Sequence, residues 1–112
     1  IVILVRNDYN LVLRCKRMER KKFTAEEILN KLSELNYWKV VDNKLLKQFK
    51  FADFAQSLAF VNRIGEIAET HDHHPDITFG WGYADVYITT HDAGGITIRD
   101  FAVAKEIDLI SG

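Results

Sequence analysis

The sequence contains one cysteine and one proline among its 112 residues. Because Cys15 has no second cysteine to pair with, an intrachain disulfide is excluded, which favours a reducing compartment; we expect a cytoplasmic location. The longest uninterrupted apolar run, Ile1 to Val5, is far shorter than the roughly 20 residues of a membrane-spanning helix. It is also too short for the core of a signal peptide. The sequence therefore predicts no membrane partner.

The chain also lacks an excess of charge of either sign. Fifteen Lys and Arg residues balance sixteen Asp and Glu residues, and the net charge is −1. This balance gives no indication of nucleic acid as a partner. The basic stretch at residues 14–22 is interrupted by Glu19 and has no aromatic residue, so we interpret it as a solvated connector. A chain of this length forms one domain and hides roughly two thirds of its extended surface, so oligomerisation would bury more.

Two stretches begin with N-cap signals and continue with the spacing of amphipathic helices. Thr24 and Glu27 form the two ends of a capping box, so we predict a helix over about residues 24–36. Asp53 takes the cap position of a second predicted helix, which runs to about Glu69. The apolar stripe of this helix consists of Phe54, Leu58, Val61, Ile64 and Ala68, while Phe60 and Ile67 lie off it and indicate a second buried face.

Four runs with the composition of strands lie around these helices. They cover residues 37–41, 45–51, 76–81 and 83–90, with turn signals at Asp42–Asn43 and Gly82. Thr97 caps a third predicted helix, with Asp100 at its third position. The order is helix, two strands, helix, two strands, helix. With short connections it predicts an α+β domain, a four-stranded antiparallel sheet with three helices packed on one face.

All four histidines fall between positions 71 and 91. His73 and His74 precede one predicted strand, and His91 follows the next strand along the chain. In a tight antiparallel hairpin the start of the first strand lies beside the end of the second, so these three histidines should meet. Asp100, at the start of the last helix, could orient His91, and Glu69 can approach from the other side.

Three interpretations of this cluster compete. Three histidines and a carboxylate could hold zinc, but His73 and His74 point to opposite sides of an extended chain, and the spacing matches no zinc motif. The histidines could also be surface residues without a role, which is common for one histidine and less so for a cluster with carboxylates. The third interpretation is acid–base catalysis, in which one imidazole removes a proton and another protonates a leaving group. We favour the third and expect no metal.

The histidines belong to a longer pattern. It reads Glu69-x3-His73-His74-Pro75-x5-Trp81-x9-His91-x8-Asp100. This pattern resembles, without departure, the signature of the pterin-4a-carbinolamine dehydratases. The resemblance extends from about Phe23 to Ile110 and includes Trp38 and Lys47-Gln48-Phe49. It implies the same sheet of four strands with three helices on one side.

The resemblance also implies an activity. Members of this family are hydro-lyases that remove water from 4a-hydroxytetrahydropterin to give quinonoid dihydropterin, which recycles tetrahydrobiopterin. No metal or organic cofactor is implied, because the pterin is the substrate. An aromatic amino-acid hydroxylase would be the pathway partner, and a homodimer or homotetramer the expected assembly. The alternative is a non-catalytic dimerisation or scaffold module, or a transcriptional co-activator, of the same fold.

Site residues follow from the same resemblance. His73 and His91 are the acid and base candidates on opposite faces of the pterin, and His74 holds the ring. Asp100 and Glu69 are assigned with them to catalysis, since they would orient imidazoles and hold a proton. The remaining substrate-binding candidates are Pro75, Thr90 through its backbone, and Trp38 as a core or site-wall aromatic. His71 lies outside the signature.

The resemblance divides the chain into two parts. Residues 23–112 form the predicted dehydratase domain, and residues 1–22 form an N-terminal extension. Within the extension, residues 1–5 and 11–13 are β-prone and predict an extra hairpin. This hairpin can be a native addition, a processed extension or foreign to the native protein.

Overall fold

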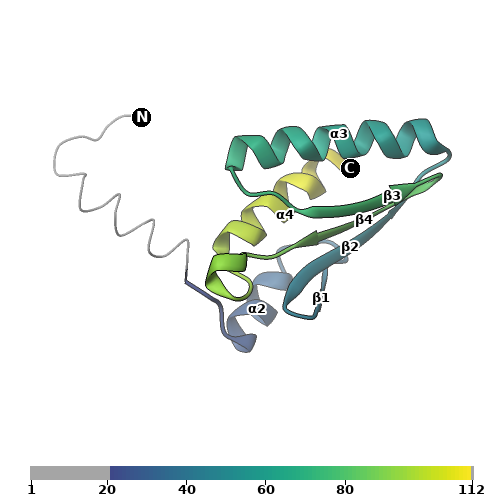
Figure 1. Cartoon of the computed structure of the whole chain (residues 1–112). Helices are drawn as coiled ribbons and strands as arrows, with labels where there is room; N and C mark the ends of the chain where they lie inside the picture. The colour runs from purple at the N-terminus through teal and green to yellow at the C-terminus, as the bar shows by residue number, and fades with distance from the viewer. Residues whose placement is uncertain (1–20, 112) are drawn as a thin grey trace.

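The computed structural model describes residues 21–111, so the predicted hairpin near the N-terminus lies outside the described residues. The described helices are α2 (Ala25–Leu32), α3 (Phe54–His71) and α4 (Ile98–Ser111). The strands are β1 (Lys39–Val41), β2 (Lys44–Lys50), β3 (Asp76–Gly80) and β4 (Tyr83–Ile88), and a 3₁₀ turn, η1 (His91–Ala93), precedes α4. Figure 1 shows this order along the chain.

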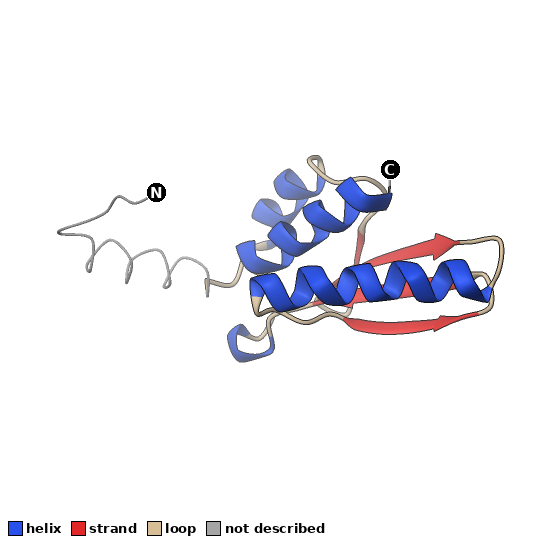
Figure 2. Cartoon of the chain, turned by 90° about the horizontal axis from the view of Figure 1, so that it is seen from above, coloured by secondary structure: helices blue, strands red, loops and turns tan. Residues whose placement is uncertain are grey.

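The strands form one antiparallel sheet in the order β1-β2-β4-β3. The hairpin of β3 and β4 pairs Asp76 with Tyr87 and Gly80 with Tyr83, and its turn contains Gly82 in a left-handed conformation. Seen from above in Figure 2, α3 lies over the sheet. The predicted α+β architecture of four strands and three helices is therefore confirmed.

The first helix begins as predicted and ends early. The Thr24 hydroxyl accepts from the Glu27 amide at 3.2 Å, and the Glu27 carboxylate accepts from the Thr24 amide at 2.8 Å, which completes the capping box. The helix was expected to reach residue 36 but stops at Leu32. Beyond it the Asn36 amide donates to Asp108 of α4 at 3.0 Å, and this contact replaces a further helical hydrogen bond.

Helix α3 buries Ile64 and Ala68 of the predicted stripe together with Phe60 of the predicted second face, but not the start of the stripe. Asp53 caps it as expected, accepting from the Gln56 amide at 2.9 Å. The side chains that face the core are centred on Phe60, and the buried set is Ser57, Phe60, Ile64 and Ala68. Phe54 and Leu58, expected in the buried stripe, remain 46% and 40% exposed. The reason is that Phe60 packs on two aromatic rings of the second strand and its end, Phe49 at 4.6 Å and Phe51 at 5.1 Å.

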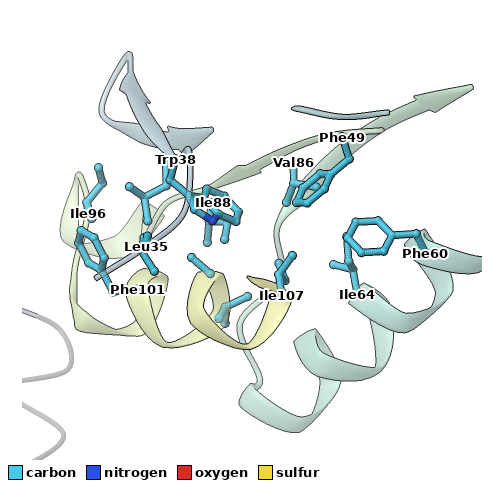
Figure 3. Packing of buried hydrophobic residues seen from close by; sticks show 13 residues of the cluster. Leu35, Trp38, Phe49, Phe60, Ile64, Val86, Ile88, Ile96, Phe101 and Ile107 are labelled. Atoms are coloured by element: carbon cyan, nitrogen blue, oxygen red, sulfur yellow. The ribbon is translucent and has the colours of Figure 1, made fainter. Parts of the chain in front are cut away.

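A single hydrophobic core joins the three helices to one face of the sheet. Its strand residues include Leu45, Val86 and Ile88, all fully buried, and they pack against Ile64 of α3 and Ile107 of α4. Figure 3 shows Val86, Ile88, Ile64 and Ile107 between the sheet and the helices, with Leu35, Trp38 and Phe101 at one end. This packing fixes α3 and α4 side by side, so the segments that follow α3 and precede α4 lie at one end of the β3–β4 hairpin.

Candidate active site

The chain reverses sharply where α3 ends. Asp72 adopts a left-handed conformation, with φ 49° and ψ 43°. The Asp72 amide donates to the Glu69 carbonyl at 3.3 Å, and the His73 amide donates to the Ala68 carbonyl at 3.1 Å. These two bonds form a Schellman motif, in which glycine is the usual left-handed residue. The reversal leaves His73 buried and His74 exposed, so the two neighbouring imidazoles face different surroundings.

Arg99 ties this loop to the first turn of α4. Its guanidinium Nη2 donates to the carbonyl oxygen of Asp72 at 2.7 Å. The contact joins a residue just after α3 to one just inside α4, far apart in the sequence. It therefore holds the histidine loop against the helix that carries Asp100.

His91 follows β4 through Thr89 and Thr90. Thr90 forms an isolated antiparallel bridge with Gly95, with their amides and carbonyls exchanging bonds of 3.1 and 3.3 Å. The residues between them form η1 and a turn at Gly94, which has a φ of 75°. The bridge closes this short loop at its base and presents His91 at the surface.

The three histidines of the signature line one cleft. Its walls are Asp72, His73, His74, Thr89, His91, Asp92 and Arg99, and its volume is about 300 Å³. That volume is at the small end of the range typical of ligand sites, about 300–1,000 Å³. His73 and His74 come from the start of the β3–β4 hairpin and His91 from its end, as the hairpin argument predicted.

Asp100 lies behind the cleft and contacts His73. Its side chain is fully buried, and Oδ1 is 2.5 Å from Nε2 of His73. Oδ2 accepts from the Thr90 hydroxyl at 2.9 Å and from the Thr97 amide at 2.8 Å. We expected Asp100 to orient His91, and the structure corrects this: the first turn of α4 faces the loop after α3, so its carboxylate meets His73.

Glu69 pairs with the third imidazole of the cleft. Its carboxylate is 2.5 Å from Nε2 of His74, and both side chains are exposed. Exposed ion pairs contribute little to stability, typically 0–1 kcal/mol as a rough guide, so this contact orients the ring more than it stabilises the fold. Glu69 therefore reaches the histidine loop from α3, as the sequence indicated.

His71 lies outside the cleft. It pairs with Glu106 and so joins the end of α3 to α4. The neighbouring hollow, about 400 Å³, is lined by Thr70, His71, His73, Ile98, Arg99 and Ala102. Only one of the signature histidines, His73, borders it. The 400 Å³ hollow therefore contains a single signature imidazole, whereas three line the cleft.

The structure does not bring all predicted site residues to the cleft. Trp38 lies in the core, where its indole Nε1–H donates to Asp108 at 2.8 Å. Pro75 is half-buried and Thr90 is buried, and neither of them lines the cleft. Trp81, expected at the end of a strand, lies in the exposed turn at the opposite end of the hairpin.

Four cleft-lining residues had no assigned role. They are Asp72, Thr89, Asp92 and Arg99. Each lies within two positions of a signature histidine or of Asp100, and this proximity is the only sequence signal that could have found them. Within residues 21–111, no group of three or more His, Cys, Asp or Glu side chains is placed to hold a metal ion. Among the same residues, no helix has both the length and the apolar character needed to cross a membrane.

The fold and cleft define an α+β domain with several imidazoles at one end of its sheet. Comparison with known proteins shows which family has this domain. The model of the pterin 4 alpha carbinolamine dehydratase family matches residues 21–110. The chain belongs to this family.

Individual relatives cover most of the domain. A provisionally named pterin-4-alpha-carbinolamine dehydratase of Picosynechococcus sp. is 45% identical over 87 residues, which are 78% of this chain and 95% of the relative. Another of the same name from Sulfurisphaera tokodaii is 41% identical over 88 residues, 79% of this chain and 95% of the relative.

Two solved structures share the fold. The transcriptional coactivator/pterin dehydratase from Brucella melitensis has a TM-score of 0.78 at 31% identity, covering 82% of this chain and all of that chain. A pterin dehydratase-like protein identified as a RuBisCO assembly factor in the alpha-carboxysome has a TM-score of 0.56 at 25% identity. It covers 70% of this chain and 90% of that protein.

Proposed function

We propose that this chain is a hydro-lyase that removes water from 4a-hydroxytetrahydropterin to give quinonoid dihydropterin. The observation that carries the proposal is the cleft in which His73, His74 and His91 converge, with a buried carboxylate behind one of them. Family membership supports the same substrate class. The proposed setting is cytoplasmic recycling of tetrahydrobiopterin beside an aromatic amino-acid hydroxylase.

The chemistry needs two proton transfers and no redox step. The bond from C4a to the hydroxyl oxygen breaks, and the hydroxyl leaves as water after it gains a proton. The N5 proton is lost as the C4a–N5 double bond forms. One group must therefore give a proton and another must accept one, and imidazoles do both near neutral pH. The pterin is the substrate, and the proposal requires no metal or organic cofactor.

The two proton-transfer groups are His73 and His91. His73 is held at the inner wall by Asp100, and His91 stands at the surface on the turn after β4. His74, held by Glu69 on the rim, positions the ring. General acid–base catalysis of this kind contributes about 10²–10⁴ in rate for each group.

A scaffold or co-activator role is the other class of function. The names of two structural neighbours mention a coactivator and an assembly factor, and they motivate this alternative. A protein that only binds a partner would have no use for a buried carboxylate–histidine pair beside two further imidazoles. The cleft therefore favours catalysis.

The test is dehydration of 4a-hydroxytetrahydropterin generated in situ by an aromatic hydroxylase and followed by absorbance. The wild-type chain should exceed the spontaneous rate, and His91→Ala should lose most of that excess. His71→Ala is the matched control, because His71 lies close by but outside the cleft. A folded wild-type protein without acceleration would exclude the dehydratase and leave the scaffold role.

A further inference from the structure

A buried chain of polar groups stands behind His73, and the proposed function does not use all of it. The side chains of Thr90, Thr97 and Asp100 are essentially inaccessible to solvent. The Thr90 and Thr97 hydroxyl oxygens are 2.8 Å apart, and Thr90 is 2.9 Å from Asp100 Oδ2. Polar groups buried this deeply destabilise a protein unless each finds a partner, so the arrangement needs a physical explanation.

The proton positions in this chain follow from what each group can donate. The Thr97 amide can only donate, and it does so to Asp100 Oδ2 at 2.8 Å. The Thr90 hydroxyl has one proton and gives it to the same oxygen. Its oxygen can then only accept from the Thr97 hydroxyl, which itself accepts from the Arg99 amide at 3.2 Å. The hydroxyls therefore donate in one direction, from Thr97 through Thr90 to Asp100.

A carboxylate oxygen can only accept, so the contact with Asp100 decides which nitrogen of His73 carries a proton. With Oδ2 filled by two donors, Asp100 turns Oδ1 towards His73 as an acceptor, 2.5 Å from Nε2. The proton of the neutral ring then lies on Nε2, and the lone pair lies on Nδ1. In the described part of the chain, the protein makes no hydrogen bond to Nδ1 of His73.

We propose that Thr90 and Thr97 are positioning residues that fix the Nε2–H tautomer of His73 through Asp100. The nitrogen that exchanges protons with the substrate is consequently Nδ1, while the Nε2 proton remains in the bond to Asp100. The catalytic part of this inference rests on the proposed function. The tautomer does not, because it follows from the buried contacts alone.

Valine and serine substitutions separate this role from simple packing. Thr90→Val and Thr97→Val keep the shape of the side chain and remove the hydroxyl, whereas Thr90→Ser and Thr97→Ser keep the hydroxyl. Thr97 also caps α4, so the matched control is Thr24→Val. Thr24 caps α2 by accepting from the Glu27 amide at 3.2 Å, and its hydroxyl takes no part in the hydroxyl chain that ends at Asp100. A general loss of a helix cap would show equally in that control.

Two measurements on the full chain test whether Thr90 and Thr97 position His73. Long-range ¹⁵N–¹H NMR correlations report the tautomer of the His73 ring, and steady-state kinetics report kcat and KM separately. We expect Nε2–H in the wild type and a mixture of tautomers in Thr90→Val. Loss of an outer hydrogen-bond partner at histidine metal sites reduces activity about 10- to 100-fold, and we expect that loss in kcat with a smaller change in KM. The serine variants should restore both readouts, and Thr24→Val should change neither.

Several outcomes would overturn the inference. One is an Nδ1–H tautomer in the wild type. Another is an unchanged tautomer and kcat in a folded Thr90→Val or Thr97→Val protein, and a third is an equal loss of kcat in Thr24→Val. If Thr90→Val does not fold, Thr97→Val supplies the same comparison, because the Thr97 hydroxyl reaches Asp100 through the Thr90 hydroxyl. A wild type without dehydratase activity would contradict the proposed function alone, since the tautomer measurement still decides the positioning role.

Discussion

At the scale of single residues, His73 and His91 differ in their surroundings. His73 is 8% exposed and bonded to a carboxylate that has no contact with water. His91 is exposed on a short turn and has no such support in the described structure. The same substitution at the two positions should therefore have the same catalytic effect and different structural effects.

Replacing either histidine with alanine should lower kcat/KM by about 10²–10⁴, because each provides one proton transfer. His91→Ala should have the same free energy of unfolding as the wild type. His73→Ala removes the partner of a buried charge, and breaking such a pair typically costs about 3–5 kcal/mol of folding free energy. Turnover and denaturant unfolding of both variants check this. Full turnover in a folded His91→Ala protein would contradict the assignment.

The convergence of the histidines could be predicted from the sequence, and the partner of Asp100 could not. A hairpin register follows from two strand patterns and a glycine turn, so His73 and His91 could be placed at one end. The orientation of α4 against the loop after α3 depends on the left-handed Asp72 and on its contact with Arg99. A glycine at position 72 would have indicated the left-handed residue in the sequence, but Asp72 and its contact with Arg99 give no such indication.

At the scale of elements, the capping box of α2 makes stability depend on pH. The Thr24 amide donates to the Glu27 carboxylate and holds its pKa below the ordinary value of 4.5, with smaller help from the Thr24 hydroxyl and Lys21 against a desolvation effect. A carboxyl whose pKa is lowered by folding stabilises the fold above its ordinary pKa, and this contribution is lost as the pH falls through the lowered value.

The corresponding variant is Glu27→Gln. It should be less stable than the wild type at about pH 7, and the difference should shrink as the pH falls through the lowered pKa towards about pH 3. Denaturant unfolding at the two pH values measures the difference. Glu26→Gln, one residue earlier and outside the box, is the control. If the difference in unfolding free energy between Glu27→Gln and the wild type instead increased at low pH, the prediction would be contradicted.

Helix starts were easier to predict than helix ends or buried faces. Thr24, Asp53 and Thr97 each mark a start by a local hydrogen bond that needs only a few neighbouring residues. The end of α2 depends on Asp108, more than 70 residues away, and the buried face of α3 depends on the aromatic rings of β2. Such long-range contacts leave no periodic signal in the local sequence.

At the scale of the whole molecule, Asp108 ties three segments together. Its carboxylate accepts from Lys47 of β2 and from the Trp38 indole, both at 2.8 Å, and from the Asn36 amide. The Lys47 side chain is only 11% exposed, so Asp108 is the partner that compensates for the burial of its ammonium group. The network joins the C-terminal helix to the connection between α2 and β1.

Asp108→Ala should lower the free energy of unfolding by about 3–5 kcal/mol, because it leaves a buried ammonium group without a partner. Removing the ammonium group as well, as in Asp108→Leu with Lys47→Met, should recover only part of that loss, because the Trp38 indole and the Asn36 amide still lose their acceptor. The control is Glu34→Ala, which removes exposed ion pairs to Lys31 at 3.8 Å and to Lys105 at 3.6 Å and should cost about 1 kcal/mol or less. Equal losses in the two single variants would contradict the account.

The apolar residues left exposed on α3 predict association between copies of the chain. Phe54 and Leu58 are exposed there, and Phe54 packs on Phe79 of β3 at 5.8 Å between ring centroids. Contiguous exposed apolar surface on a small domain commonly marks an interface. We expect a homodimer or homotetramer by light scattering and a smaller species for Leu58→Lys. A wild type that is monomeric throughout the accessible concentration range would contradict this expectation.

The most direct test of the account is the pH dependence of kcat/KM for dehydration, measured for wild type, His73→Gln and His91→Gln after subtraction of the spontaneous rate. An enzyme that needs one protonated and one neutral imidazole should give a bell-shaped profile. Each of the two substitutions should remove a different limb of the bell. Two variants that are slower but keep both limbs would contradict it, because the protons would then move through other groups.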